Sequence, residues 1–329
     1  MSQPFFSIVM PTYRTEEWCL KRAIECVRQQ TFGSWELLIV DDNASDSELV
    51  KTKRIITDSR LDPTKVRLIV QQVNQGAGAA RNRALNECSG EWIAFLDADD
   101  FWDSRYLETT AGVTKKDNPA IVSSNITIVN DRGSRVMGSR EGCELIRDEE
   151  YVTDHLSCPS GICVRRDLLN KAGGFDSSLP AREDWDMWTR VLRCAERPAV
   201  TFLKKDQVFV YRSEGRDSVS SSARRNVEGT QAVLHKIEGY EDVSQAVKAR
   251  CRCAQLRYCC LVCIKEGEGQ YLRRWLHDEG QIARSLHFYV LSYAAPLVPR
   301  IRRLVKKRLY ALSKNQGESC SRETGVIEK

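Results

Sequence analysis

Along the first half of the chain, short apolar runs alternate with segments in which apolar residues recur every three or four positions. A short run that is apolar on both faces predicts a buried strand, and the longer spacing predicts a helix with one apolar side. The predicted strands are residues 6–10, 36–40, 66–70 and 92–96, and the predicted helices are 16–30, 47–58 and 77–88. This alternation predicts an α/β fold whose mostly parallel sheet is flanked by helices.

After residue 120 the apolar runs become shorter and are separated by glycine and charged loops. Further strands are predicted within 120–129 and at 160–164 and 208–212, and further helices at 166–172 and 183–193. A serine-rich stretch follows, and from about residue 226 the pattern is helical almost throughout. We therefore expect an α/β domain over 1–225, a helical C-terminal region over 226–314 and a polar, disordered tail over 315–329.

The charge balance does not favour nucleic-acid binding. The chain of 329 residues carries a formal charge of +5, and acidic and basic residues are mixed through most of it. A nucleic-acid surface would gather positive charge on one face or along one helix.

Positive charge does gather near the C-terminus, where residues 287–312 combine apolar and aromatic side chains with six basic ones. The basic residues are Arg300, Arg302, Arg303, Lys306, Lys307 and Arg308. An apolar, aromatic stretch that runs into a polybasic helix suits an anionic membrane surface. A helix packed on the rest of the protein with a solvated basic face is the alternative, and the sequence leaves both open.

Thirteen cysteines are unusual, and five of them crowd into the stretch from Cys251 to Cys263. That stretch lacks paired CxxC knuckles and turn residues, so a helix with buried thiols is favoured over a zinc site. No signal-peptide pattern precedes the first predicted strand, and no apolar run approaches the ~18–20 residues that span a bilayer. We expect a cytoplasmic protein with reduced thiols.

Polar residues follow three of the predicted strands at the point where each strand ends. Thr12 and Tyr13 follow the first, Asp41 and Asp42 the second, and the sequence 97–100 the strand that ends at residue 96. Ligands of open α/β sheets bind beyond the carboxyl ends of the strands. The sequence therefore predicts a binding site at this edge.

Asp97 and Asp99 are candidate metal ligands. In extended chain a spacing of two points both carboxylates the same way, and such hard oxygens suit Mg²⁺ or Mn²⁺ bound with phosphate oxygens. The metal would neutralise charge on a departing diphosphate. A polar loop in which Asp99 or Asp100 caps the next helix is the alternative.

Asp42 and the glycine-containing turn at 74–82 are candidates for nucleotide binding. An acid at a strand end can accept hydrogen bonds from ribose hydroxyls or from a base, although a turn or helix cap is the alternative. Gly76 permits close approach of the backbone, and the helix start with Arg81 favours a phosphate or a base carbonyl. The turn lacks the full dinucleotide fingerprint GxGxxG, which argues against a dehydrogenase.

Glu183 and Asp184 precede a predicted helix. Acidic residues at a helix start are favoured by the helix dipole alone. Asp184 is also placed to act as a general base that takes a proton from an acceptor hydroxyl. The sequence leaves both interpretations open.

Taken in order, these segments resemble the family 2 glycosyltransferases of the GT-A fold. The resemblance extends over about residues 7–220, and its matching pieces are 7–13, 29–32, 36–43, 74–76, 79–82, 90–100, 173–176 and 183–185. It implies an inverting enzyme that moves a sugar from a nucleotide-diphosphate-sugar, with UDP the commonest nucleotide, to an acceptor hydroxyl. Such an enzyme would serve bacterial surface polysaccharide or glycan assembly, with a glycan or lipid-linked glycan acceptor presented at the inner face of the membrane.

The resemblance also implies roles for individual residues. Pro11, Tyr13, Asp42, Gly76 and Arg81 would belong to the nucleotide site, with Tyr13 against the base, Asp42 accepting from it, and Arg81 near the base or diphosphate.

The remaining roles concern the metal and the chemistry. Asp97 would approach the ribose and the metal, Asp99 would bind the metal, and Asp184 would be the catalytic base. Tyr211 and Arg212, followed by Ser218 and Ser220, resemble a flexible segment that closes over the diphosphate.

Two other functions are weighed against this one. A nucleotidyltransferase would carry a glycine-rich basic loop after its first strand, but residues 11–17 contain no glycine. A non-catalytic scaffold derived from a glycosyltransferase would not need Asp97, Asp99 and Asp184, which are all present.

Overall fold

The computed structural model describes residues 3–130, 133–137, 141–145, 152, 156–197, 199–212 and 222–278. The basic segment 287–312, for which membrane binding was one of two interpretations, lies outside the described residues, as do the predicted tail 315–329, Ser218 and Ser220. One compact unit comprises Met1–Arg216 with Ala232–Lys248, and a second comprises Asp217–Gln231 with Ala249–Lys329. The segment 232–248, which was predicted to be part of the helical region, thus belongs to the first unit.

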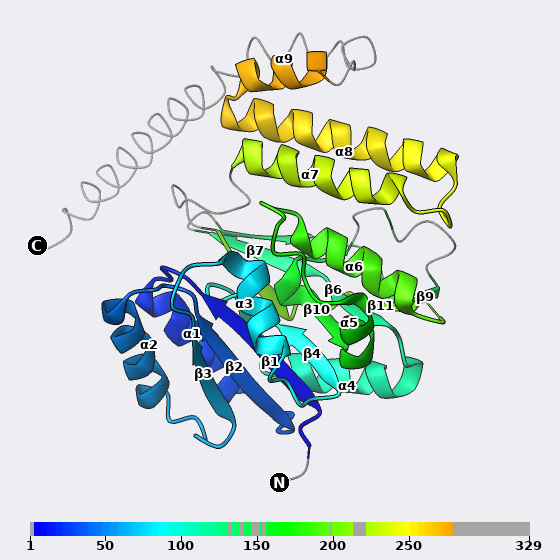
Figure 1. Ribbon diagram of the computed structural model, residues 1–329. Helices are drawn as coiled ribbons and strands as arrows, with labels where there is room; N and C mark the ends of the chain where they lie inside the picture. Colours follow the sequence, from blue (N-terminus) through cyan, green and yellow to red (C-terminus); the bar gives the residue numbers. More distant parts are fainter. Residues whose placement is uncertain are drawn as a thin grey trace, which may run out of the picture. The chain divides into compact units, whose positions relative to one another are not determined.

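The first unit is built on an eight-stranded sheet with the order β3-β2-β1-β4-β10-β6-β11-β9 (Figure 1). Its first four strands are parallel, as predicted. They are β1 (Phe6–Thr12), β2 (Trp35–Asp41), β3 (Val66–Val70) and β4 (Trp92–Phe95). The register pairs Thr12 with Asp41 and Asp41 with Val70, so these strands end at a common edge.

Beyond β4 the sheet is mixed, because β10 (Ile162–Arg165) runs antiparallel to both of its neighbours, β4 and β6 (Ile121–Ser124). β11 (Ala199–Leu203) is parallel to β6, and β9 (Gly142–Leu145) is antiparallel to β11. The reversal at β10 brings the short helix η2 (Pro159–Gly161), which precedes it, to the edge where β4 ends.

Helices cover the sheet because its strands are apolar on both faces. On one face Ile8 and Met10 join a core with α1 (Glu17–Arg28), α2 (Asp46–Asp58) and α4 (Tyr106–Asp117). The other face packs against α3 (Gly76–Leu85), as Figure 1 shows for β1 and β2.

Two further helices pack together beside β10, namely α5 (Arg166–Ala172) and α6 (Glu183–Cys194). The sequence pattern predicts no counterpart of α4, because threonines and an alanine make up much of its buried face and weaken the apolar periodicity.

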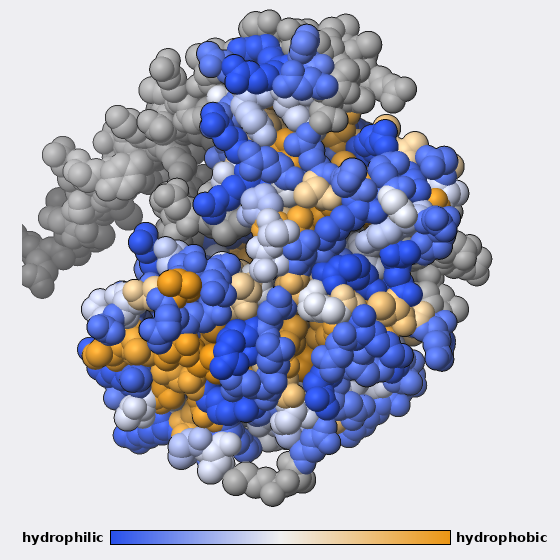
Figure 2. Space-filling model, viewed as in Figure 1, coloured by the Kyte–Doolittle hydropathy of each residue, from blue (hydrophilic) through white to orange (hydrophobic). Residues whose placement is uncertain are grey.

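The edge strand β3 is only partly covered. Only Ile69 in it is fully buried, whereas Val70 is exposed, as is Val73 just beyond. Figure 2 shows apolar side chains gathered over the part of the surface where β2 and β3 lie.

A small second sheet has the order β5-β12-β7-β8. Its strands are β5 (Phe101–Trp102), β12 (Val208–Tyr211), β7 (Ile126–Asn130) and β8 (Gly133–Met137). β5 follows the acidic sequence 97–100 directly, and β12 pairs with β5. This pairing brings Tyr211 to the edge where β4 ends.

The C-terminal part of the described chain is helical, as predicted, with α7 (Ala223–Glu238), α8 (Gln245–Glu266) and α9 (Gly269–Asp278). In the second unit, Cys259, Cys260 and Cys263 are buried with Leu272 and Leu276. Burial raises the pKa of Cys260 and of Cys263 to about 12, so these thiols stay protonated at neutral pH.

The cysteines in the described part of the chain form no disulfide. Within the same part, no helix combines the length and the apolar character needed to cross a bilayer.

A substitution at Gly90, just before β4, would test the packing of the sheet. A Cβ there would lie 2.4 Å from the Ser7 backbone nitrogen and 2.7 Å from the Phe6 carbonyl carbon, and backbone cannot yield as a flexible side chain does. We expect Gly90→Ala to lower the free energy of unfolding by roughly 1–3 kcal/mol in urea titrations. Gly33→Ala, whose Cβ meets no atom within 4 Å, is the control, and equal stability of the two variants would contradict the prediction.

Candidate active site

Asp97 to Asp100 form a turn beyond the end of β4. The strand ends at Phe95, and the Asp100 amide donates to the Asp97 carbonyl at 2.9 Å. The predicted extended geometry of Asp97 and Asp99 is therefore wrong, and strand alternation does not set the direction of their carboxylates. In this turn Asp100 makes buried polar contacts.

Ser160 and Tyr211 hold this acidic turn. The Ser160 hydroxyl accepts from the Asp97 amide at 3.0 Å and donates to Asp100 Oδ2 at 2.5 Å. The Tyr211 amide donates to Asp100 Oδ1 at 3.0 Å. Burial raises the pKa of Asp100 well above its usual range, and the nearby Asp99 and Asp97 raise it further. Asp100 thus anchors the turn from inside the protein.

Asp99 lies beside an aromatic cluster that also contains a cation. Its carbonyl accepts from Arg22 Nη2 at 2.9 Å. The Arg22 guanidinium lies 4.0 Å from the centre of the Phe101 ring and also contacts the rings of Trp18 and Tyr211. Arg22 therefore fixes the backbone of the turn and leaves the direction of the Asp99 carboxylate to other contacts.

Arg81 joins the acidic turn to α6. Its guanidinium, on α3, is buried and lies 2.7 Å from Asp97 Oδ1 and 3.1 Å from Glu183 Oε1. Burial alone would lower the pKa of Arg81, but Asp97 and Glu183 outweigh it and raise that pKa. The guanidinium therefore forms ion pairs with two acids from segments far apart in the sequence.

Asp42 organises the start of α3. Its carboxylate accepts from Gln71 Nε2 and the Gln75 amide on one oxygen, and from Asn74 Nδ2 and the Gly76 amide on the other. These four donors match the lone pairs of a carboxylate. Gly76 has φ of +86°, a conformation that favours glycine. These contacts fit the turn or helix-cap interpretation of Asp42, and its role in nucleotide binding stays a prediction.

Asp41 contrasts with its neighbour. The residue is buried, and its Oδ1 accepts from the Asn43 amide at 3.0 Å and from Asn43 Nδ2 at 2.9 Å. Its buried Oδ2 has no hydrogen-bond partner in the described part of the protein. A buried oxygen without a donor is costly unless a ligand supplies one. The sequence pattern of two consecutive acids does not distinguish Asp41 from Asp42.

Pro11 and Tyr13 lie at the same edge. Pro11 is in β1, opposite Val40, and Tyr13 is one residue beyond the end of β1. Tyr13 is 44% exposed, and the Arg14 guanidinium lies 5.2 Å from the centre of its ring. One edge of the sheet therefore presents an exposed aromatic ring near the two acids at the end of β2.

Asp184 lies in the first turn of α6, between Glu183 and Trp185. The Trp185 amide donates to Asp184 Oδ1 at 2.8 Å. Burial raises the pKa of Glu183, the neighbouring Asp184 adds to the rise, and Arg81 opposes it. Because Arg81 binds Glu183 and Asp97 together, the structure brings the first turn of α6 to the acidic turn.

The described residues contain no group of three or more histidine, cysteine, aspartate or glutamate side chains suited to holding a metal. One or two carboxylates with phosphate oxygens and water are nevertheless enough for Mg²⁺.

Sequence reasoning missed Asp100, Ser160, Glu183 and Arg22 as members of the site. Asp100 and Glu183 stand beside predicted residues, which is a usable signal. Ser160 and Arg22 carry no sequence signal, because they reach the site through the antiparallel β10 and the packing of α1.

Comparison with known proteins identifies a family that matches half of the chain. The family model "Glycosyl transferase family 2" matches residues 7–173. A curated Escherichia coli protein, UDP-Glc:alpha-D-GlcNAc-diphosphoundecaprenol beta-1,3-glucosyltransferase WfgD, is 31% identical over 194 residues, which are 59% of this chain and 72% of that protein. The amylovoran biosynthesis glycosyltransferase AmsB of Erwinia amylovora is 27% identical over 197 residues, 56% of this chain and 63% of that protein.

Solved structures show the same fold. The crystal structure of S. aureus TarS 1-349 in complex with UDP-GlcNAc aligns with a TM-score of 0.60 and 22% identity, covering 74% of this chain and 69% of that one. TarS 1-349 in complex with UDP aligns with a TM-score of 0.57. The predicted α/β fold of the GT-A type is confirmed.

The Arg81 bridge can be tested by stability measurements. Removing one partner of a buried ion pair leaves the other charge uncompensated, so Arg81→Met should cost about 3–5 kcal/mol. In a double-mutant cycle with Glu183→Gln, the coupling energy should be about 0.5–3 kcal/mol. Additive effects would contradict the bridge, and Arg165→Met, in a half-exposed pair with Asp167, should cost much less.

The stability that Arg81→Met loses should depend on pH. A carboxyl whose pKa is raised by folding stabilises the native state at low pH and ceases to do so as the pH rises through the raised value. Removal of Arg81 lets the pKa of Glu183 rise further. The stability lost in Arg81→Met should therefore be smaller at pH 5 than at pH 8.

Proposed function

Because the chain belongs to glycosyl transferase family 2 and is a glycosyltransferase, we propose that it transfers a sugar from a UDP-sugar to an acceptor hydroxyl with inversion at the anomeric carbon. The family model confirms the resemblance to family 2 glycosyltransferases that the sequence motifs indicated. The donor nucleotide, the stereochemistry and the residue roles are the proposal.

One observation carries the proposal. The buried Arg81 guanidinium contacts Asp97, in the acidic turn, and Glu183, next to Asp184. A direct displacement needs a base for the acceptor and a site for the leaving group held in fixed relation to each other. The bridge supplies such a relation between the two sets of carboxylates.

The nucleotide would bind at the ends of β1 and β2. The exposed ring of Tyr13 offers a face for the base, and Asp41 Oδ2 offers a buried acceptor for a base or ribose donor. Pro11 lies in β1 beside these groups, while Asp42 and Gly76 hold the start of α3. Bound UDP in a structural relative with the same fold supports UDP as the nucleotide.

A divalent cation, Mn²⁺ or Mg²⁺, fits the acidic turn. The Asp97 side chain is 31% exposed, and Arg81 contacts it through Oδ1, so its second carboxylate oxygen is available to a metal. Asp97 and Asp99 with the donor's phosphates match the small carboxylate sets that hold such ions. The cation would neutralise the charge on the departing diphosphate.

Asp184 would be the catalytic base. It would take the proton of the acceptor hydroxyl while that oxygen attacks the anomeric carbon, as the bond from that carbon to the diphosphate oxygen breaks. Arg81 would compensate part of the charge of Glu183, so Asp184 would face less like charge from its neighbour.

The acceptor would be a glycan or lipid-linked glycan in bacterial surface polysaccharide assembly. WfgD is named for action on a diphosphoundecaprenol-linked sugar, and AmsB for amylovoran biosynthesis. A lipid-linked acceptor would place the enzyme in the cytoplasm at the inner face of the membrane. Residues 287–312, outside the described part of the chain, would then contact anionic lipid.

Nucleotide binding is the first test. UDP at about 100 times its dissociation constant should stabilise the protein by about 2.7 kcal/mol in thermal denaturation, with the larger shift when Mn²⁺ is present. Asp99→Asn should remove the Mn²⁺-dependent part of this shift and weaken Mn²⁺ binding in calorimetry. Asp62→Asn, which changes an exposed turn, is the control. A protein that ignores every nucleoside diphosphate with or without Mn²⁺ would refute the proposal.

Turnover is the second test. Asp184→Asn should lower kcat for donor hydrolysis or transfer by roughly 10²–10⁴-fold while the affinity for UDP stays unchanged, because the change removes the base and spares the donor site. The matched control is Asp167→Asn, which also removes an acid from the first turn of a helix. Unchanged kcat in Asp184→Asn would assign the base elsewhere.

A further inference from the structure

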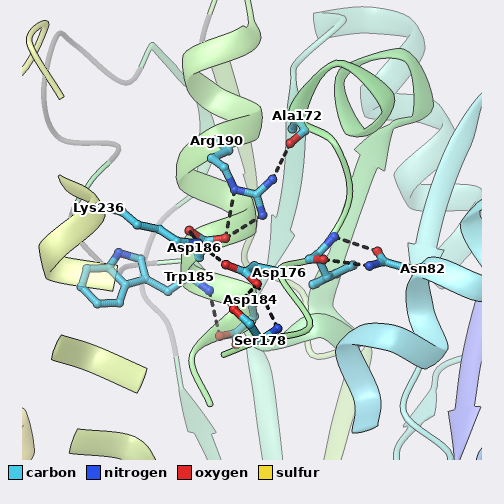
Figure 3. A network of polar contacts seen from close by, with 10 residues as sticks. Asn82, Ala172, Asp176, Ser178, Asp184, Trp185, Asp186, Arg190 and Lys236 are labelled. Carbon is cyan, nitrogen blue, oxygen red and sulfur yellow. Dashed lines mark hydrogen bonds and ion pairs between the residues drawn. The ribbon is translucent and has the colours of Figure 1, made fainter. Parts of the chain in front are cut away.

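A lysine on α7 reaches the first turn of α6. Lys236 Nζ lies 2.9 Å from Asp186 Oδ1 and 2.6 Å from Asp176 Oδ2 (Figure 3). All three residues belong to the first unit. Lys236 and Asp186 lie outside the range of the family match, which ends at residue 173.

Asp186 ties Lys236 to the body of α6. Its side chain is 1% exposed, and its Oδ2 accepts from Arg190 Nε at 2.9 Å and Nη2 at 2.6 Å. Arg190 in turn donates to the Ala172 carbonyl at the end of α5. Asp186 is therefore a buried carboxylate held by two cations, and only Lys236 comes from outside α5 and α6.

Asp176 ties Lys236 to the loop that precedes α6. Its Oδ1 accepts from the Ser178 amide at 2.9 Å and the Ser178 hydroxyl at 2.6 Å. One residue earlier, Phe175 exchanges two hydrogen bonds of 2.7 Å with Asn82 of α3 (Figure 3). The loop is therefore bound at Asp176 by Lys236 and at Phe175 by Asn82 of α3.

The first turn of α6 concentrates negative charge. It contains Glu183, Asp184 and Asp186, and the Trp185 amide between them donates to Asp184 Oδ1. Arg81 compensates Glu183, and Lys236 with Arg190 compensates Asp186. The two acids that flank Asp184 are therefore each anchored to a cation from another helix, Arg81 on α3 and Lys236 on α7.

We propose that Lys236 is a positioning residue for Asp184. By joining Asp186 to the loop at Asp176, its ammonium sets where the first turn of α6 lies and hence where the Asp184 carboxylate stands. This inference rests on the proposed role of Asp184 as the base.

A positioning role and a purely structural role predict different magnitudes. The Lys236 side chain is 31% exposed, and its pair with Asp176 is partly exposed. Buried Asp186 keeps the Arg190 guanidinium when Lys236 is removed, so the network contributes little stability through Lys236 alone. A displacement of a catalytic group by about 1 Å can instead cost on the order of 100-fold in rate. Loss of Lys236 should therefore affect turnover far more than folding.

The experiment measures release of UDP from UDP-glucose and from UDP-N-acetylglucosamine by the full chain. Lys236→Met should lower kcat roughly 10- to 100-fold, with unchanged UDP affinity and a nearly unchanged melting temperature. Lys236→Arg, which keeps a cation able to contact both carboxylates, should restore most of kcat. Lys205→Met, at an exposed lysine outside the network, should behave as the parent.

Combination with Asp184→Asn decides whether Lys236 acts through Asp184. Lys236→Met should then cause no further loss of kcat, because the group that it positions is already gone. Multiplying effects, or a kcat for Lys236→Met equal to that of the parent, would overturn the inference.

Failure of the inference and failure of the proposed function give different results. A parent enzyme that hydrolyses both donors and loses this activity in Asp184→Asn keeps the proposed function, whatever Lys236→Met does. If the parent hydrolyses neither donor and binds no UDP, both the proposed function and the inference about Lys236 are refuted. A Lys236→Met protein that melts far below the parent while Lys236→Arg also lacks activity would make Lys236 structural and overturn the inference.

Discussion

The candidate site depends on one buried cation, the guanidinium of Arg81. It lies between Asp97 and Glu183, which come from segments far apart in the sequence, and it is almost completely buried. Without it two carboxylates would face each other in a region of low dielectric, which is strongly unfavourable. Arg81 is placed by α3, and α3 starts where Asp42 accepts the amides of Gln75 and Gly76.

The same requirement recurs through the site, because every buried carboxylate needs a donor or a cation. Asp100 receives the Ser160 hydroxyl and the Tyr211 amide, and Asp186 receives Arg190 and Lys236. These partners come from η2, β12, α6 and α7, so the acids are oriented by several elements of the first unit. Groups fixed in this way need little reorganisation when a charged substrate binds.

The contrast between Asp41 and Asp42 shows where pattern reasoning stops. Both acids end the same predicted strand, and a sequence provides no reason to separate them. In the folded protein Asp42 is saturated by four donors, whereas Asp41 keeps a buried oxygen without a partner among the described residues. The extended geometry expected for Asp97 and Asp99 was wrong as well, since the chain forms a turn between Asp97 and Asp100.

Local sequence was sufficient for the parallel strands β1 to β4, their helices except α4, the family, and the edge where the polar residues gather. Apolar periodicity and short motifs are local, and the parallel order follows from them. The antiparallel β10, the contacts of Ser160 and Arg22, and the reach of Lys236 to α6 emerged only from the three-dimensional packing of the chain. Those contacts join residues far apart in the chain, and their energy depends on burial and on neighbouring charges, which no local pattern encodes.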